Sequence, residues 1–211
     1  MALAALKQAW RGASNPWGSV RQAVENLNSV VNTALNSNLT LEKGVTPAVS
    51  TLSKGSGVSS AETYAVGVSK NGTLITTRIV VDLTGLVGSA TDLDIIGNTG
   101  GAANCNWGRI TAALNGAMVG GRVTCLEVPA GGATDIDFYS AVEATGAQDA
   151  LVTGLTETAL VTSGGAWTSG AVKGMTAVPA ANDYLYIANG AASGGTFTAG
   201  KFLIELFGYA A

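Results

Sequence analysis

The sequence contains no histidine and few charged residues. None of its 211 residues is His, and Asp, Glu, Lys and Arg together make up 12%. Imidazole titrates near neutral pH and is the commonest metal ligand in proteins, so catalytic triads and metal sites that use histidine are excluded. Aromatic residues make up only 6%, which argues against an aromatic-lined glycosidase cleft. We therefore expect a protein that is not an enzyme, without catalytic residues, cofactor or metal.

Long hydrophobic runs and basic clusters are also missing. No stretch of 18 apolar residues occurs, so we expect no membrane span. Lys7 and Arg11 bracket the first apolar stretch instead of preceding it, which is unlike a signal peptide and predicts cytoplasmic synthesis without export. The basic side chains are dispersed, and we expect no nucleic-acid partner.

Small residues are abundant, and charge is divided unevenly along the chain. The sequence has 29 glycines and is 47% hydrophobic, which is typical of a folded domain. Residues 1–60 carry five basic and two acidic side chains, whereas residues 61–211 carry six basic and twelve acidic ones. We interpret these parts as a basic arm (1–60) and an acidic body (61–211), and expect the arm to bind an acidic surface or another copy.

The arm has the pattern of an amphipathic helix. From Leu3 to Leu41, positions at alternating steps of three and four are apolar in eleven of twelve cases. The pattern predicts a short helix over residues 2–11 and a second from Ser14–Asn15, with Pro16 in its first turn, to about Leu35 or Asn38. This helix packs either on its own domain or on a partner. Residues Thr40–Ser60, rich in Ser, Thr, Gly and Lys, predict a linker.

We favour packing of the helix on a partner over packing on its own domain. Tryptophan is enriched at binding hot spots, and a helix attached through a linker has less reason to cover its own core. The candidate residues for self-association or capsid docking are Trp10, Trp17, Val20, Val24, Leu27 and Val31.

The body has the pattern of antiparallel β structure. Asn71-Gly72 and Asn115-Gly116 are hairpin signals, and no crossover helix is evident. We expect a mainly β fold: an antiparallel β-sandwich or jelly-roll-like body with an N-terminal α-helical arm. The segment Lys201–Phe207 has apolar residues on both faces, which predicts a central strand. Strands are predicted over 63–68, 73–83, 92–96, 105–114, 117–128, 134–139, 183–188 and 197–207.

The cysteines, the aspartate pairs and two tryptophans of the body could react or bind ligands, but we expect structural roles for them. Without export, Cys105 and Cys125 are expected to be free thiols in the core. The pairs Asp92/Asp94 and Asp135/Asp137 are expected at a solvated strand edge or loop; a Ca²⁺ site or carboxylate chemistry is the lesser alternative. Trp107 and Trp167 are expected in the core, with ligand contact as the alternative.

The end of the body suggests a family. Residues 181–208, ANDYLYIANGAASGGTFTAGKFLIELFG, with the Gly/Ala/Thr-rich strands before them, resemble virion structural proteins of tailed bacteriophages, most of all head decoration (cement) proteins. The resemblance implies a homotrimer of jelly-roll-like subunits. It also implies a location on the virion's capsid surface, with the major capsid protein and other copies of the chain as partners, after synthesis in the host cytoplasm.

The resemblance is one of style and carries no diagnostic motif. The long helical arm departs from the pattern, which leaves an alternative open: a tail fibre, baseplate or receptor-binding component that recognises glycans.

Overall fold

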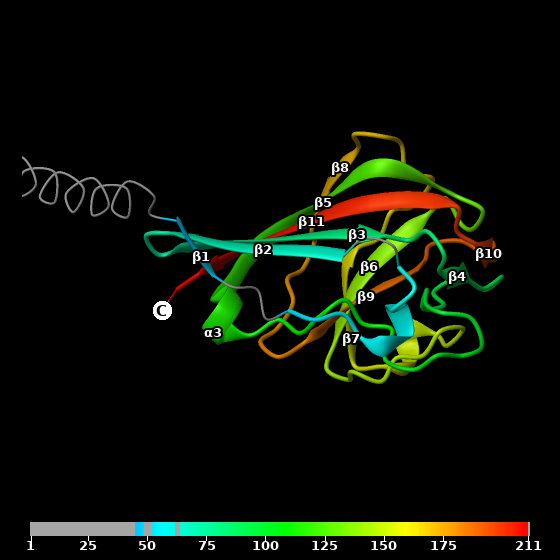
Figure 1. Ribbon diagram of the computed structural model, residues 1–211, viewed down its shortest axis with the longest axis horizontal. Helices are drawn as coiled ribbons and strands as arrows, with labels where there is room; N and C mark the ends of the chain where they lie inside the picture. Colours follow the sequence, from blue (N-terminus) through cyan, green and yellow to red (C-terminus); the bar gives the residue numbers. More distant parts are fainter. Residues whose placement is uncertain (1–44, 49–51, 62–63, 211) are drawn as a thin grey trace, which may run out of the picture. The chain divides into compact units, whose positions relative to one another are not determined.

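The computed structural model describes residues 45–48, 52–61 and 64–210 (Figure 1). The chain divides into two units, Met1–Thr46 and Pro47–Ala211. The predicted helices of the arm lie in the first unit and outside the described residues, so they stay a prediction. The same holds for its candidate binding residues Trp10, Trp17, Val20, Val24, Leu27 and Val31.

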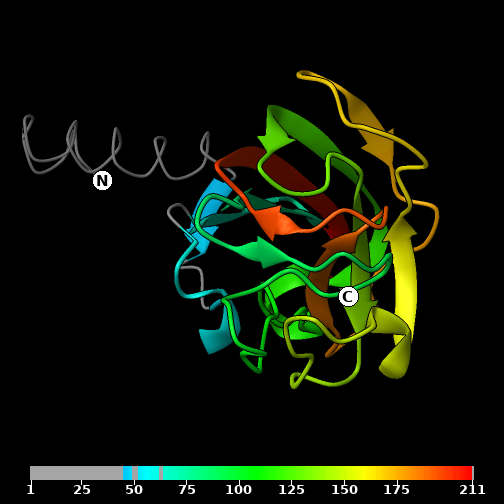
Figure 2. The same cartoon turned by 90° about the vertical axis from the view of Figure 1, so that its right-hand side faces the viewer.

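The second unit is mainly β, with antiparallel sheets packed together, as the sequence predicts (Figure 1, Figure 2). Its one described α-helix is the single turn α3 (Ala112–Asn115), and 3-10 turns cover η1 (Ser56–Val58) and η2 (Val152–Gly154). The strands are β1 (Val45–Ala48), β2 (Tyr64–Asn71), β3 (Leu74–Asp82), β4 (Val87–Gly88), β5 (Ala117–Ala130), β6 (Ile136–Ala141), β7 (Glu157–Val161), β8 (Val172–Gly174), β9 (Tyr184–Asn189), β10 (Gly195–Thr196) and β11 (Ala199–Tyr209).

The largest sheet has six strands in the order β1-β2-β3-β11-β5-β8. A second sheet has the order β7-β6-β9, and β10 pairs with β4. The C-terminal strand β11 is hydrogen-bonded to β3 on one side and to β5 on the other. This confirms the prediction that Lys201–Phe207 forms a central strand.

The first predicted hairpin is also confirmed. Asn71 pairs with Leu74, so a two-residue turn joins β2 to β3, and Gly72 adopts the positive φ of 61° that this turn favours. Predicted strands at 117–128, 134–139 and 183–188 correspond to β5, β6 and β9, and the one at 197–207 corresponds largely to β11.

The second hairpin signal, Asn115-Gly116, was interpreted wrongly, as was the strand predicted over Cys105–Leu114. Asn115 ends the helical turn α3, and Gly116 follows it with φ 73°. Thr111 caps the turn by accepting a hydrogen bond from the Leu114 amide at 3.3 Å, while its own amide donates to Asn115 Oδ1 at 2.9 Å. Before the turn, Gly108 at φ 118° interrupts an extended segment that forms only an isolated bridge to β9.

The predicted strand over residues 92–96 is wrong as well. Asp94 and Ile95 each form an isolated bridge, to Leu151 and Ala188, and the segment is otherwise turn and loop. Leu93 has a positive φ of 67°, which breaks an extended ladder. No strand was predicted at the short strands β4, β7, β8 and β10; β8 lies at the edge of the large sheet (Figure 2).

Residues 52–60, predicted as part of the linker, belong to the body. Leu52 and Val58 are buried in the core. The Gly55 amide donates to Asn106 O at 2.7 Å, and the Gly57 amide donates to Asn104 O. The glycines allow close packing here: a Cβ on Gly55 would lie 1.9 Å from Asn104 O.

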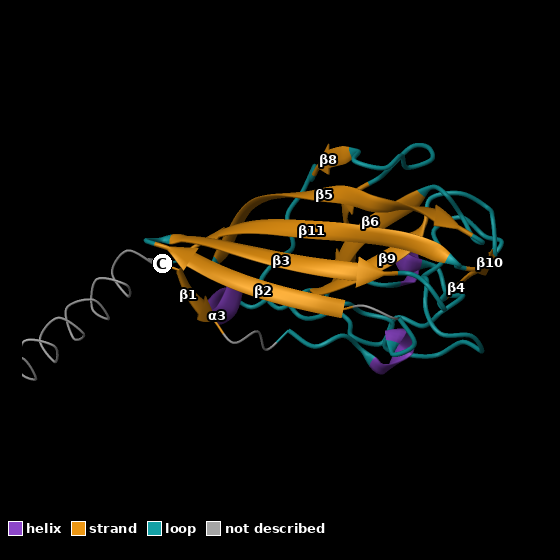
Figure 3. Ribbon diagram, turned by 45° about the horizontal axis from the view of Figure 1, so that its top comes forward, coloured by secondary structure: helices purple, strands orange, loops and turns teal. Residues whose placement is uncertain are grey.

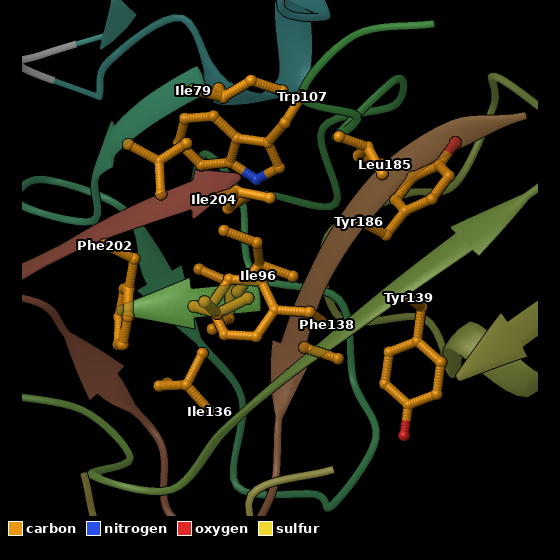
Figure 4. Packing of buried hydrophobic residues seen from close by; sticks show 14 of the residues in the cluster. Ile79, Ile96, Trp107, Ile136, Phe138, Tyr139, Leu185, Tyr186, Phe202 and Ile204 are labelled. Carbon is orange, nitrogen blue, oxygen red and sulfur yellow. The ribbon is translucent and has the colours of Figure 1, made fainter. Parts of the chain in front are cut away.

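An aromatic cluster joins the two larger sheets. Phe138 of β6, Phe202 of β11 and Trp167 meet edge to face, with ring centroids 5.2–6.1 Å apart, and Figure 4 shows the two phenylalanines among their aliphatic neighbours. Trp107 and Trp167 are both buried, which confirms core packing. Cys105 and Cys125 are free and buried, as expected. Burial raises the pKa of the Cys105 thiol to about 11, so it is inert.

Replacing the central ring of this cluster should destabilise the body strongly. Phe202→Ala removes a fully buried side chain that contacts both other rings, and the expected loss is about 3–5 kcal/mol of unfolding free energy in urea titrations. Val142→Ala, at a side chain that is 59% exposed, is the control and should change stability by less than about 0.5 kcal/mol. A Phe202→Ala loss below about 1 kcal/mol would contradict the packing.

Candidate interaction surface

The six-stranded sheet has two different faces. Along β3, Ile75, Ile79 and Val81 are buried, whereas Arg78 between them is exposed. Strand residues alternate between faces, and residues paired across strands share one. The face opposite the core, called here the outer face, is made by Ala65, Gly67, Ser69, Asn71, Leu74, Thr76, Arg78, Val80, Asp82, Ala117, Gly120, Arg122, Thr124, Glu127, Val172, Gly174, Lys201, Leu203, Glu205, Phe207 and Tyr209.

No other described element covers the outer face. In Figure 3 the strands β2, β3, β11 and β5 lie side by side in front, while β6 and β9 lie behind them. The aromatic cluster of Phe138, Trp167 and Phe202 packs against the opposite, core face of the sheet. The body therefore presents a broad, twisted sheet surface to its surroundings.

An ion-paired row crosses the middle of the outer face. Arg78, Glu205 and Arg122 are directly paired on β3, β11 and β5. Arg78 Nε lies 3.0 Å from Glu205 Oε1, and Arg122 Nε lies 2.5 Å from Oε2. The carboxylate is only 5% exposed, while the arginine side chains are 55% and 50% exposed. The two guanidinium groups thus cover a carboxylate on the solvent-facing side of the sheet.

The arginines favour the ionised form of Glu205. The hydrogen bond from Arg122, assisted by that from Arg78, lowers the pKa of the carboxyl below its ordinary value against the opposing effect of burial. The carboxylate is therefore charged at neutral pH and fully engaged within the chain.

A second group of ion pairs lies near one end of the outer face. Lys201 Nζ is 3.2 Å from Asp82 Oδ2 and 3.1 Å from Glu127 Oε2. Together with the row around Glu205, three basic and three acidic side chains pair within the face. The outer face is consequently close to neutral, and a partner needs no opposite net charge to bind it.

Apolar side chains lie between these ion pairs. Ala65, Val80, Leu203, Thr124 and Val172 form the row next to Glu205, called here the apolar row. Val172 is 55% exposed. At the end of the sheet, Leu74 and Tyr209 face each other across β3 and β11 and are both about half exposed. Apolar groups that surround satisfied polar groups are typical of protein–protein interfaces.

Glycines leave open space at both ends of the charged row. Gly67 pairs with Arg78 and Gly174 pairs with Arg122, and a Cβ at either glycine would meet no atom within 4 Å. Glycine weakens a strand interior and often marks the close approach of another chain. The outer face is therefore uneven, with large side chains beside gaps.

The structure also brings two predicted aspartates together away from the outer face. A Cβ on Gly190 would lie 2.6 Å from Asp135 Oδ1 and 3.0 Å from Asp137 Oδ1, so the glycine makes room for both carboxyl groups. Asp137 accepts a hydrogen bond from the Ser163 amide at 2.5 Å. Burial, followed by the charges of Asp135 and Asp92, raises the pKa of Asp137.

The other predicted pair, Asp92 and Asp94, is not part of a metal site formed by the described residues. Ser89 donates a hydrogen bond to Asp94, while Asp92 contributes charge near Asp137. Within residues 45–48, 52–61 and 64–210, no group of three or more Cys, Asp and Glu side chains is arranged to hold a metal. In the same part of the chain, no helix has the length and apolar character required to cross a bilayer.

Between the sheets, the side chains leave a gap that is too narrow to hold a water molecule. It is a packing gap of the core, and its lining residues are Phe138, Tyr139, Leu160, Met175, Leu185, Tyr186 and Ile204.

The outer face was not found by sequence reasoning, which placed the binding residues in the arm. One signal was available: β11 has Leu203 and Phe207 on the face opposite Phe202, Ile204 and Leu206. Comparisons with protein families, with curated proteins and with solved structures found no match to this chain.

The Glu205 ion pairs should stabilise the body above acidic pH. A lowered pKa means that their contribution is present above the ordinary carboxyl pKa and is lost as pH falls through the lowered value. Glu205→Gln should cost about 1–3 kcal/mol in urea unfolding at pH 7, and less in acid, where the wild-type carboxyl is also protonated. Glu127→Gln, at a 44% exposed side chain, is the control and should cost under about 1 kcal/mol. Equal losses from both variants would refute the special position of Glu205.

Asp137 should have the opposite pH dependence. Its raised pKa means that the folded body gains stability as pH falls from neutral through that value toward the ordinary one. Asp137→Asn keeps the acceptor for Ser163, so it should raise the melting temperature at pH 7, with a difference that vanishes in acid. The exposed Asp149→Asn serves as control. A lower melting temperature of Asp137→Asn at pH 7 would show that the charge is favourably engaged instead.

Proposed function

We propose that this protein is a structural subunit of a bacteriophage virion, a head decoration (cement) protein that stabilises the shell by binding neighbouring proteins. The supporting observation is the uncovered outer face, where apolar side chains lie between ion pairs already made within the chain. Such a surface gains from burial against a partner and presents little net charge to attract small charged ligands.

The virion assignment comes from the resemblance of residues 181–208 and the Gly/Ala/Thr-rich strands to decoration proteins. In this proposal the partners are the major capsid protein and other copies of the chain, assembled as a homotrimer on the capsid surface. The arm contributes through Trp10, Trp17, Val20, Val24, Leu27 and Val31. A tail fibre, baseplate or glycan-binding receptor component is the alternative.

We also propose that the body is jelly-roll-like. Two features support this finer description: the last strand, β11, lies between β3 and β5, and the chain crosses from one sheet to the other between β5 and β6. Neighbouring strands that are distant in sequence are typical of Greek-key and jelly-roll topologies.

Removing the arm's central aromatic anchor should weaken self-association. A buried tryptophan at an interface is worth at least about 2 kcal/mol, so Trp17→Ala should raise the dissociation constant of the oligomer about 30-fold in light-scattering titrations. Trp17→Phe, which keeps an aromatic ring, is the matched control and should lose less. Wild-type protein that stays monomeric at all concentrations would contradict self-association.

A virion reconstruction tests the location. Density for the body on the head, lost with Trp17→Ala, would support the decoration role. Density on the tail would favour the alternative, and virions without this protein would exclude both.

A further inference from the structure

The outer face has the length to bind one helix along its central strand. Strand β11 has 11 residues and spans about 37 Å at about 3.4 Å per residue. The helix that the sequence predicts from Ser14–Asn15 to about Leu35 has about 22 residues and would span about 33 Å. The two elements therefore match in length to within about one helical turn.

The chemistry of the two surfaces also matches. One face of the six-stranded sheet is covered by the core, and an apolar strip on the other face is most simply covered by the apolar side of a helix. Along β11, Leu203 and Phe207 lie on either side of Glu205, and the apolar row crosses β11 at Leu203. The arm's Trp17, Val20, Val24, Leu27 and Val31 supply the apolar side of the helix. Because the charges on the outer face pair within it, they neither demand nor repel a charged partner.

The net charges of the two parts of the chain also favour the arm as the segment that binds the outer face. Residues 1–44 carry four basic and two acidic side chains, while residues 45–211 carry seven basic and twelve acidic ones. The opposite signs favour their encounter. Gly67 and Gly174 carry no side chain that would obstruct a partner at the two ends of the charged row.

We propose that the outer face binds residues 1–44 of a neighbouring copy of the chain. The inference rests on the proposed function for self-association and names the surface that receives the arm. An arm bound to the next copy is a heterologous contact, and repeating such a contact around a rotation axis closes a ring. One contact type then suffices to build the proposed homotrimer.

Cross-linking between two singly substituted full-length chains tests this contact. One chain carries Val24→Cys in the arm, and the other carries Thr124→Cys on the apolar row; both substitutions are nearly isosteric. The chains are mixed and treated with a short bismaleimide, which should not reach Cys105 and Cys125 because both are buried. The expected result is a product joining the two different chains.

The matched control replaces Thr124→Cys by Thr158→Cys, which changes another half-buried threonine on β7 of the smaller sheet. The Thr124→Cys mixture should give at least ten times more cross-linked product, and unchanged melting temperatures establish that all variants fold. A further substitution, Leu203→Lys on the apolar row, should reduce the product at least tenfold.

Three results would overturn the inference. Product no greater than in the Thr158→Cys mixture would show that the arm does not bind the outer face. In a third variant that carries both Val24→Cys and Thr124→Cys, cross-links only within one chain would show that each copy covers its own face. Products between two Thr124→Cys chains, without arm products, would show face-to-face pairing of copies. None of these results bears on whether the protein is in the virion, which the reconstruction decides separately.

Discussion

The pairing of β11 along both of its edges is the constraint on which the rest of the body depends. Because side chains alternate along a strand, one register places Phe202 against Phe138 and Trp167 in the core and Glu205 on the outer face. A shift of β11 by one residue would move the Phe202 ring to the outer face and the Glu205 carboxylate into the core. Core packing and surface chemistry therefore fix the same register, and neither can change alone.

This register also determines the chemistry of the outer face. Arg78 and Arg122 come from strands on either side of β11, so their guanidinium groups close over Glu205 without help from another molecule. A partner that covers the face meets ion pairs already formed and leaves no isolated buried charge, which is the costly case. Binding there can be driven by burial of the apolar row, and specificity by the uneven surface of arginines and glycines.

Local patterns predicted those parts of the fold that local forces determine. The hairpin signalled by Asn71-Gly72, whose two turn residues are Gly72 and Thr73, and the double-sided apolar pattern of β11 needed no knowledge of distant residues. The same reasoning failed at Asn115-Gly116, because a glycine with positive φ ends a helical turn as readily as it makes a hairpin. It failed again at Gly55, where glycine provides close contact with Asn104 and not a flexible linker. In both cases, contacts with residues distant in sequence determined which of two locally allowed conformations formed.

The candidate surface could not be predicted because it exists only after distant strands pair. Arg78 and Arg122 lie 127 and 83 residues before Glu205, and nothing near any of them in sequence indicates the contact.

Because the chain has no histidine, the response of the body to acid depends on carboxyl groups, and the fold shifts the pKa values of two of them in opposite directions. Asp137, buried beside Asp135, favours its proton, whereas Glu205, held by arginines, favours its charge. A fall in pH therefore relieves the cost of the buried Asp137 charge, whereas below the ordinary carboxyl pKa it weakens the ion pairs of Glu205.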